Sequence, residues 1–267
     1  MSLRSAITAL GMLLVGQAAA GTPTPPLHEI CRQSTPTIRE LWLKGAYDAP
    51  PAVAALMVDA IDGKLSEVRR LLQGMKPADA TRWRQSALLT ATWAGQSAVV
   101  DGLLDDGAAV DEKGWIPPLK SDVFDQTVVT MKHDSRFGGP PVVNRMMTTG
   151  MVGNRIQTIG PALTVATECG DVATLDVLLR HHAEVSPGGA TNVADALMVA
   201  TVGGDTPIVE RLLDHGADPC ADDRHIAQVH LKHPDRPTHT LAQIGTRAQL
   251  PAALIARLSC PSVATTY

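Results

Sequence analysis

The sequence predicts an all-α solenoid of stacked helix–turn–helix units. Three observations favour this class: one pattern occurs four times, its copies are nearly evenly spaced, and the apolar residues (45%) are almost all non-aromatic, since aromatic residues make up only 3%. The copies begin near residues 54, 86, 161 and 195. A single pair of short helices cannot bury its apolar side chains alone, so each unit must stack on the next.

A leucine and a glycine align the four copies. In every copy the glycine follows the leucine, here called the anchoring leucine, by seven residues. The pairs are Leu56 and Gly63, Leu88 and Gly95, Leu163 and Gly170, and Leu197 and Gly204. The anchoring leucines of the first two copies are 32 residues apart and those of the last two are 34 apart, which is the period of helix–turn–helix arrays.

The fourth copy illustrates one unit. Leu197 and Ala200 fall on one helical face, and Gly204 ends this first helix. Pro207 fits the first turn of a second helix because it needs no backbone N–H there. The apolar stripe of that second helix consists of Ile208, Leu212 and Leu213.

The interval from Leu88 to Leu163 is about two periods long and predicts a degenerate unit at about 116–151. Leu119 takes the place of its anchoring leucine, and a loop at 130–139 is inserted between its helices. Such a loop is either a working surface or a tolerated excursion into solvent. Residues 240–260 predict a terminal cap, so the array covers 53–260 as about five repeats with caps.

Two segments precede the array. Residues 1–20 have the layout of a cleavable secretory signal: Arg4, an apolar run at 6–15, and three alanines before Gly21. Ten apolar residues are too few to span a bilayer. We therefore expect an exported, periplasmic or secreted protein that begins near Gly21. Residues 21–52 predict a proline-rich spacer and an amphipathic capping helix at 37–46 that covers the first repeat.

The four copies resemble the ankyrin repeat over most of the chain after residue 20. This resemblance implies a binding scaffold that holds another protein with its concave face, by the finger before each anchoring leucine and the two residues before each glycine. The partner-binding residues predicted in this way are Ile61, Trp83, Trp93, Trp115, Phe124, Glu168 and Val202. Exposed tryptophans are typical of interface hot spots. The alternative is that the rings pack between fingers or under the 130–139 loop.

Four cysteines in an exported chain suggest disulfides, and four allow three pairings. Stacking brings the finger that carries Cys220 near Cys260, so we expect a bridge between these two. Cys31 and Cys169 are separated by several units along the predicted array, and they are expected to be free thiols. The alternative is that no cysteine is bonded.

Charge and motifs narrow the class further. The formal net charge of −4 disfavours nucleic acid as a partner. No nucleophile elbow, phosphate-binding loop or HExxH motif is present, so we expect a non-enzymatic protein without cofactor or metal. An alternative is a metal-binding protein or hydrolase that uses the histidines at 221–239 (His225, His230, His233 and His239), although their spacing is not that of paired zinc ligands.

These expectations combine into a monomeric, periplasmic protein-binding scaffold. Two functions fit within this class. One is an inhibitor or immunity-type protein that binds a toxin or secreted enzyme on its concave face, and the other is a protective partner of a periplasmic enzyme.

Overall fold

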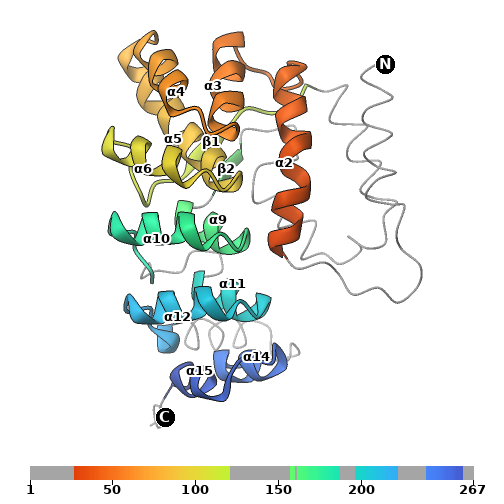
Figure 1. Cartoon of the computed structure of the whole chain (residues 1–267), viewed down its shortest axis with the longest axis vertical. Helices are drawn as coiled ribbons and strands as arrows, with labels where there is room; N and C mark the ends of the chain where they lie inside the picture. Colours follow the sequence, from red (N-terminus) through yellow and green to blue (C-terminus); the bar gives the residue numbers. More distant parts are fainter. Residues whose placement is uncertain (1–26, 121–156, 160, 187–195, 222–238, 261–267) are drawn as a thin grey trace, which may run out of the picture.

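The computed structural model describes residues 27–120, 157–159, 161–186, 196–221 and 239–260, and these form an elongated stack of antiparallel helix pairs (Figure 1). The predicted all-α, ankyrin-like class is confirmed. The described strands are short: β1 (Gly114–Ile116) pairs antiparallel with β2 (Gln157–Ile159). No helix within the described ranges is both long and apolar enough to cross a membrane.

The described helices of the array form five units of two helices each. Unit one is α3 (Pro51–Ile61) with α4 (Leu65–Gln73), and unit two is α5 (Pro77–Trp93) with α6 (Ser97–Asp105). Unit three is α9 (Ala162–Glu168) with α10 (Val172–Arg180), unit four is α11 (Ala196–Gly203) with α12 (Thr206–Asp214), and unit five is α14 (Leu241–Arg247) with α15 (Ala252–Arg257). Each first helix packs on the next first helix, and each second helix on the next second helix.

The predicted glycines end the first helices in the left-handed conformation, with φ of 75°, 69°, 65° and 69° at Gly63, Gly95, Gly170 and Gly204. This region is costly for residues with a Cβ. At Gly95 space is also short, because a Cβ there would lie 2.9 Å from a carboxylate oxygen of Asp171 in unit three. The glycine therefore serves both the turn and the close approach of the next unit.

The anchoring leucines form the centre of the stack. Leu56, Leu88 and Leu197 are fully buried, and Leu163 is 2% exposed. In units two to four a buried threonine follows four residues later, and its hydroxyl donates to the leucine's carbonyl oxygen at 2.7–2.8 Å; these are Thr92, Thr167 and Thr201. The hydroxyls are thereby satisfied without leaving the apolar layer.

Ion pairs connect neighbouring units on the side of their second helices, with one pair at each of the four junctions. Each consists of an arginine and an aspartate with an N···O distance of 2.6–3.2 Å: Arg69–Asp106, Arg180–Asp101, Arg211–Asp176 and Arg257–Asp214. They are largely solvent-exposed, so each contributes little to stability. Their regular succession nevertheless shows that units one to five are consecutive neighbours.

The structure contradicts the predicted role of Leu119. This residue does not begin a helix but lies in extended backbone, in an isolated antiparallel bridge with Tyr47. Moreover, α9 packs directly on α5 and α10 on α6, which leaves no place for a further unit between units two and three. The segment leaves the stack through β1 and returns through β2. The predicted loop at 130–139 and second helix at 140–151 lie outside the described residues.

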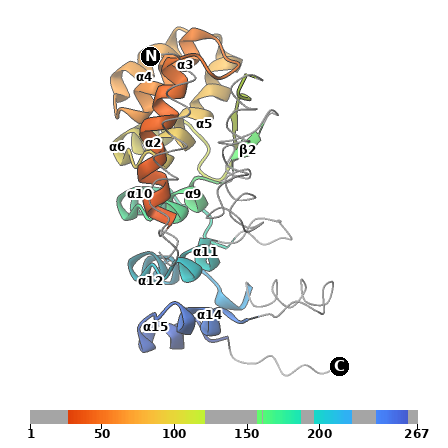
Figure 2. The same ribbon diagram turned by 90° about the vertical axis from the view of Figure 1, so that its right-hand side faces the viewer.

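The predicted capping helix is also different from the one observed. Helix α2 (Leu27–Leu43) begins ten residues before the predicted start, contains Pro36, and lies along the stack from α3 to α9 instead of covering its end (Figures 1 and 2). A helix of 17 residues is about 25 Å long. It can therefore pass over three units whose helices are about 8–10 Å apart.

The path of α2 explains an error in the predicted cysteine pairing. The structure contains the expected Cys220–Cys260 bond, but Cys31 and Cys169 are also bonded, with their Cα atoms 5.4 Å apart. The prediction that these two are free thiols is wrong because it placed Cys31 before a cap at the end of the array. In the structure Cys31 lies on α2 where this helix reaches unit three.

Candidate interaction surface

The surface that the sequence predicts to bind a partner is formed by the C-terminal ends of the first helices. We call it the inner face and define it by the two residues before the turn glycine in units one to four. The inner face changes along the stack. Ile61 of unit one is 5% exposed, Trp93 and Glu168 of units two and three are half-buried, and Val202 of unit four is 50% exposed.

Helix α2 explains the burial at the first units, because it is fastened to the inner face at both ends of this region. Arg39 of α2 donates to the carboxylate of Asp62 in unit one (Nε–Oδ1 2.5 Å, Nη2–Oδ2 2.7 Å). Cys31 of α2 is bonded to Cys169 in unit three. Asp62 and Cys169 occupy the same position of their repeats, six residues after the anchoring leucine. The chain therefore covers its own inner face over units one to three.

The Arg39–Asp62 contact is a bidentate ion pair, the geometry in which a guanidinium and a carboxylate bind most strongly. The hydrogen bond from Arg39 lowers the pKa of Asp62, and Lys64 acts in the same direction. Asp62 is therefore ionised at every pH at which an aspartate with the ordinary pKa is ionised.

Apolar contacts hold the second half of α2 on unit one. Ile38 is 6% exposed and Trp42 only 1%. The Trp42 ring stacks on Tyr47 with centroids 4.0 Å apart. Tyr47 is only 2% exposed, and this burial raises the pKa of its hydroxyl. Since Tyr47 also pairs with Leu119, this cluster joins α2, unit one and the segment that follows unit two.

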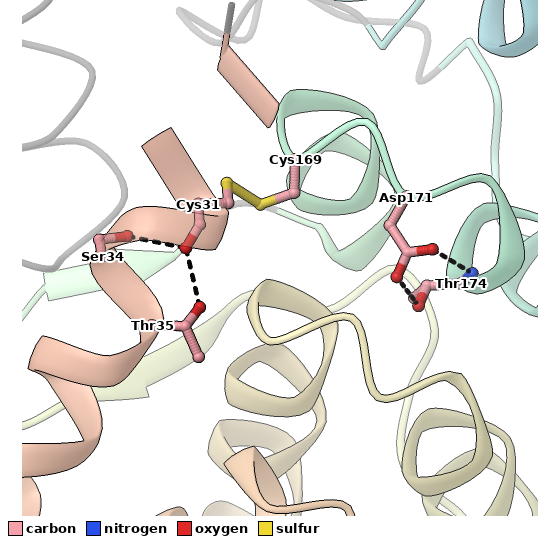
Figure 3. The surroundings of a disulfide bond; sticks show 6 residues. All are labelled: Cys31, Ser34, Thr35, Cys169, Asp171 and Thr174. Carbon is pink, nitrogen blue, oxygen red and sulfur yellow. Dashed lines mark hydrogen bonds between the residues drawn. A yellow bond between two sulfur atoms is a disulfide. The ribbon is translucent and has the colours of Figure 1, made fainter. Parts of the chain in front are cut away.

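The first half of α2 reaches unit three through the disulfide (Figure 3). Cys31 and Cys169 are both buried, at 5% and 8% exposure. One turn further along α2, the hydroxyls of Ser34 and Thr35 both donate to the Cys31 carbonyl oxygen, at 3.1 and 2.8 Å. These bonds lie directly before Pro36, which cannot donate a backbone hydrogen bond.

The tryptophans predicted on the fingers come together, but not as an exposed surface. The rings of Trp83 and Trp115 are 4.8 Å apart, and the Arg82 guanidinium lies 3.6 Å from the Trp115 centroid. Trp83 is only 7% exposed and Trp115 is half-buried. The expected exposure is therefore wrong for Trp83, because β1 folds back on α5 and covers its ring. Trp83 and Trp115 therefore follow the alternative given above, in which the rings pack between fingers.

Trp93 does not join that pair. It ends α5, ten residues after Trp83, which corresponds to about 15 Å along the helix. Its indole N–H is buried without a hydrogen-bond acceptor among the described residues. Ile61 is buried, so its predicted exposure is also wrong, whereas Val202 is exposed. Phe124 lies outside the described residues.

One group of side chains has the composition of a metal site. Ligand atoms of Asp101, Asp105 and His181 lie within 4.8 Å of one another between units two and three. Two of them already have protein partners, because His181 Nε2 lies 2.8 Å from Asp101 Oδ1 and Arg180 bonds the same oxygen. This hydrogen bond with His181 lowers the pKa of Asp101. The arrangement fits an ion-pair network between units. Of the histidines at 221–239, those at 225, 230 and 233 lie outside the described residues.

The comparison with known families agrees with this architecture. The model of the family described as ankyrin repeat matches residues 195–224, which contain unit four. The chain contains an ankyrin repeat. Ankyrin repeats are typically non-enzymatic modules of protein–protein interaction, so the match indicates an interaction scaffold. A search of curated proteins finds no match.

Sequence reasoning missed the residues that cover the inner face, namely Cys31, Arg39 and Trp42. A partial signal was present. If the chain is exported, as residues 1–20 predict, its four cysteines are most simply satisfied as two pairs, and pairing Cys220 with Cys260 leaves Cys31 for Cys169. That pairing requires the helix to run along the array.

Proposed function

We propose that this protein is a periplasmic, non-enzymatic scaffold of the inhibitor or immunity type, which binds a toxin or a secreted enzyme on its inner face. The observation that carries the proposal is an ankyrin array whose inner face is covered in units one to three and uncovered at Val202 of unit four. Contact between the partner and the array is then expected at units four and five.

Three features support this proposal. The array provides a large, rigid surface of the kind that repeat proteins use for binding. Two disulfides agree with an oxidising compartment such as the periplasm. The layout of residues 1–20 agrees with export to that compartment.

The test starts from affinity capture with the oxidised protein in a periplasmic extract, followed by binding measurements with each purified candidate. Val202→Lys places a charge on the uncovered inner face. We expect it to weaken binding at least about tenfold, because the interface would have to bury an unpaired charge, while the melting temperature stays unchanged.

Leu43→Lys is the matched control. Leu43 is the other exposed large apolar side chain of the described residues, at 59%, and it lies on α2. We expect this change to leave the affinity within about twofold. Equal losses in both variants would contradict a partner site on units four and five, and capture of no toxin, enzyme or other protein would contradict the proposed function itself.

A further inference from the structure

We propose that the first half of α2, residues 27–35, is an autoinhibitory strap that closes the inner face of unit three and opens when the Cys31–Cys169 bond is reduced. The inference rests on the proposed function in one respect, namely that the inner face is the binding surface. It concerns the control of this surface rather than the identity of the partner.

The two halves of α2 are held in different ways. Residues 37–43 are fixed to unit one by the buried side chains of Ile38 and Trp42 and by the ion pair from Arg39 to Asp62. Residues 27–35 are fixed to unit three covalently, through Cys31. Loss of one bond therefore acts on the first half and leaves the anchors of the second half in place.

Pro36 separates the two halves mechanically. It removes one hydrogen bond from the helix and its ring opposes the preceding turn. A helical segment of nine residues is marginal in water without tertiary support. Because Pro36 interrupts the hydrogen bonds of the helix, residues 37–43 contribute little to the helicity of residues 27–35. Once the covalent tie is cut, residues 27–35 should therefore lose their helical structure on α9.

The surface uncovered by this release is continuous with the part that is already open. Glu168 and Cys169 occupy in unit three the positions that Val202 and Gly203 occupy in unit four, and α9 packs directly on α11. Opening the strap thus extends the open inner face from unit four to unit three. Cys169, to which the strap is bonded, is one of the two residues before the turn glycine of unit three, where the sequence predicts contact with a partner.

The chemical step is thiol–disulfide exchange with a dithiol reductant, either a small dithiol or a dithiol protein. The dithiol gives two electrons and two protons, and its two sulfurs become a disulfide. The Cys31–Cys169 bond breaks to give two thiols. Because both cysteines are buried whereas Cys220 and Cys260 are half-buried, the Cys220–Cys260 bond should be reduced first.

The experiment is hydrogen exchange of the full-length oxidised protein during a time course with dithiothreitol, with bond status read by alkylation. We expect amide exchange of residues 27–35 to accelerate at least about tenfold when Cys31–Cys169 opens. Amides of residues 37–43 and of the array that exchange through local opening, rather than through global unfolding, should change less than about threefold. The earlier stage, with only Cys220–Cys260 reduced, should leave residues 27–35 protected. The readout requires no partner. The strap proposal can therefore fail while the proposed function stands, and the proposed function can fail while the strap proposal stands.

Two variants sharpen the test. Cys31→Ser/Cys169→Ser should reproduce the fast exchange under oxidising conditions, and Cys220→Ser/Cys260→Ser should not. Pro36→Ala restores the missing N–H and should return protection to residues 27–35 in the reduced protein. The proposal would be overturned if the exchange of residues 27–35 were unchanged after reduction. It would also be overturned if the whole array melted both in the reduced protein and in the Cys31→Ser/Cys169→Ser variant.

Discussion

Units one to three and units four and five are built from the same repeat but are stabilised differently. The first three are crossed by α2, which connects unit one with unit three through Asp62 and Cys169. The last two carry no such helix in the described residues, and their disulfide, Cys220–Cys260, joins cysteines only 40 residues apart. The comparison shows that one repeat supports a closed surface and an open one, depending on what a segment outside the repeats covers.

The largest difference between the two regions should appear when their disulfides are removed in turn. Chain-entropy estimates give up to about 5 kcal/mol for the 138-residue separation of Cys31 and Cys169 and about 4 kcal/mol for the 40-residue separation of Cys220 and Cys260. The free energy of unfolding of the two double-serine variants, measured in denaturant, should follow this order. The reverse order would show that α2 contributes less to the fold than the local bond does.

A smaller effect should follow from adding a methyl group at Gly95, where unit three approaches unit two. Gly95→Ala combines a positive φ with a Cβ only 2.9 Å from the Asp171 carboxylate. Gly216→Ala in unit four has a similar φ of 86° but open space around its Cβ, so it reports the backbone strain alone. We expect about 1–2 kcal/mol for Gly216→Ala and a greater loss for Gly95→Ala, both measured by denaturant unfolding. Equal losses would mean that Asp171 moves away freely.

The smallest effect should be the response of α2 to acid. The pKa of Asp62 is lower in the folded protein than in the unfolded chain. The ion pair with Arg39 therefore stabilises the fold at pH values above the ordinary carboxyl pKa of about 4. This contribution is lost as the pH falls through the lowered pKa. Hydrogen exchange of residues 37–43, corrected for its intrinsic pH dependence, should therefore rise at the acidic end. Asp62→Asn should show the faster exchange already at neutral pH and no further response.

The repeat itself could be predicted from the sequence because its determinants are local. The seven-residue spacing from leucine to glycine predicted where each first helix ends, and the left-handed turns followed at Gly63, Gly95, Gly170 and Gly204. Burial of the anchoring leucines followed from the same periodicity. Val202 is 50% exposed, in agreement with its predicted position on the inner face, and no other segment among the described residues covers it to any large extent.

Only the tertiary structure decided which parts of the array are open. Whether Ile61 and Trp83 face solvent depends on α2 and β1, whose docking brings together residues far apart in the chain. The Cys31–Cys169 pairing spans 138 residues, and no periodicity encodes it. The sequence by itself determined the unit, its turns and its stacking, because these are set within about 33 residues. The path of α2 was decided by packing and by a covalent bond between distant segments, and this path defines the surface that remains for a partner.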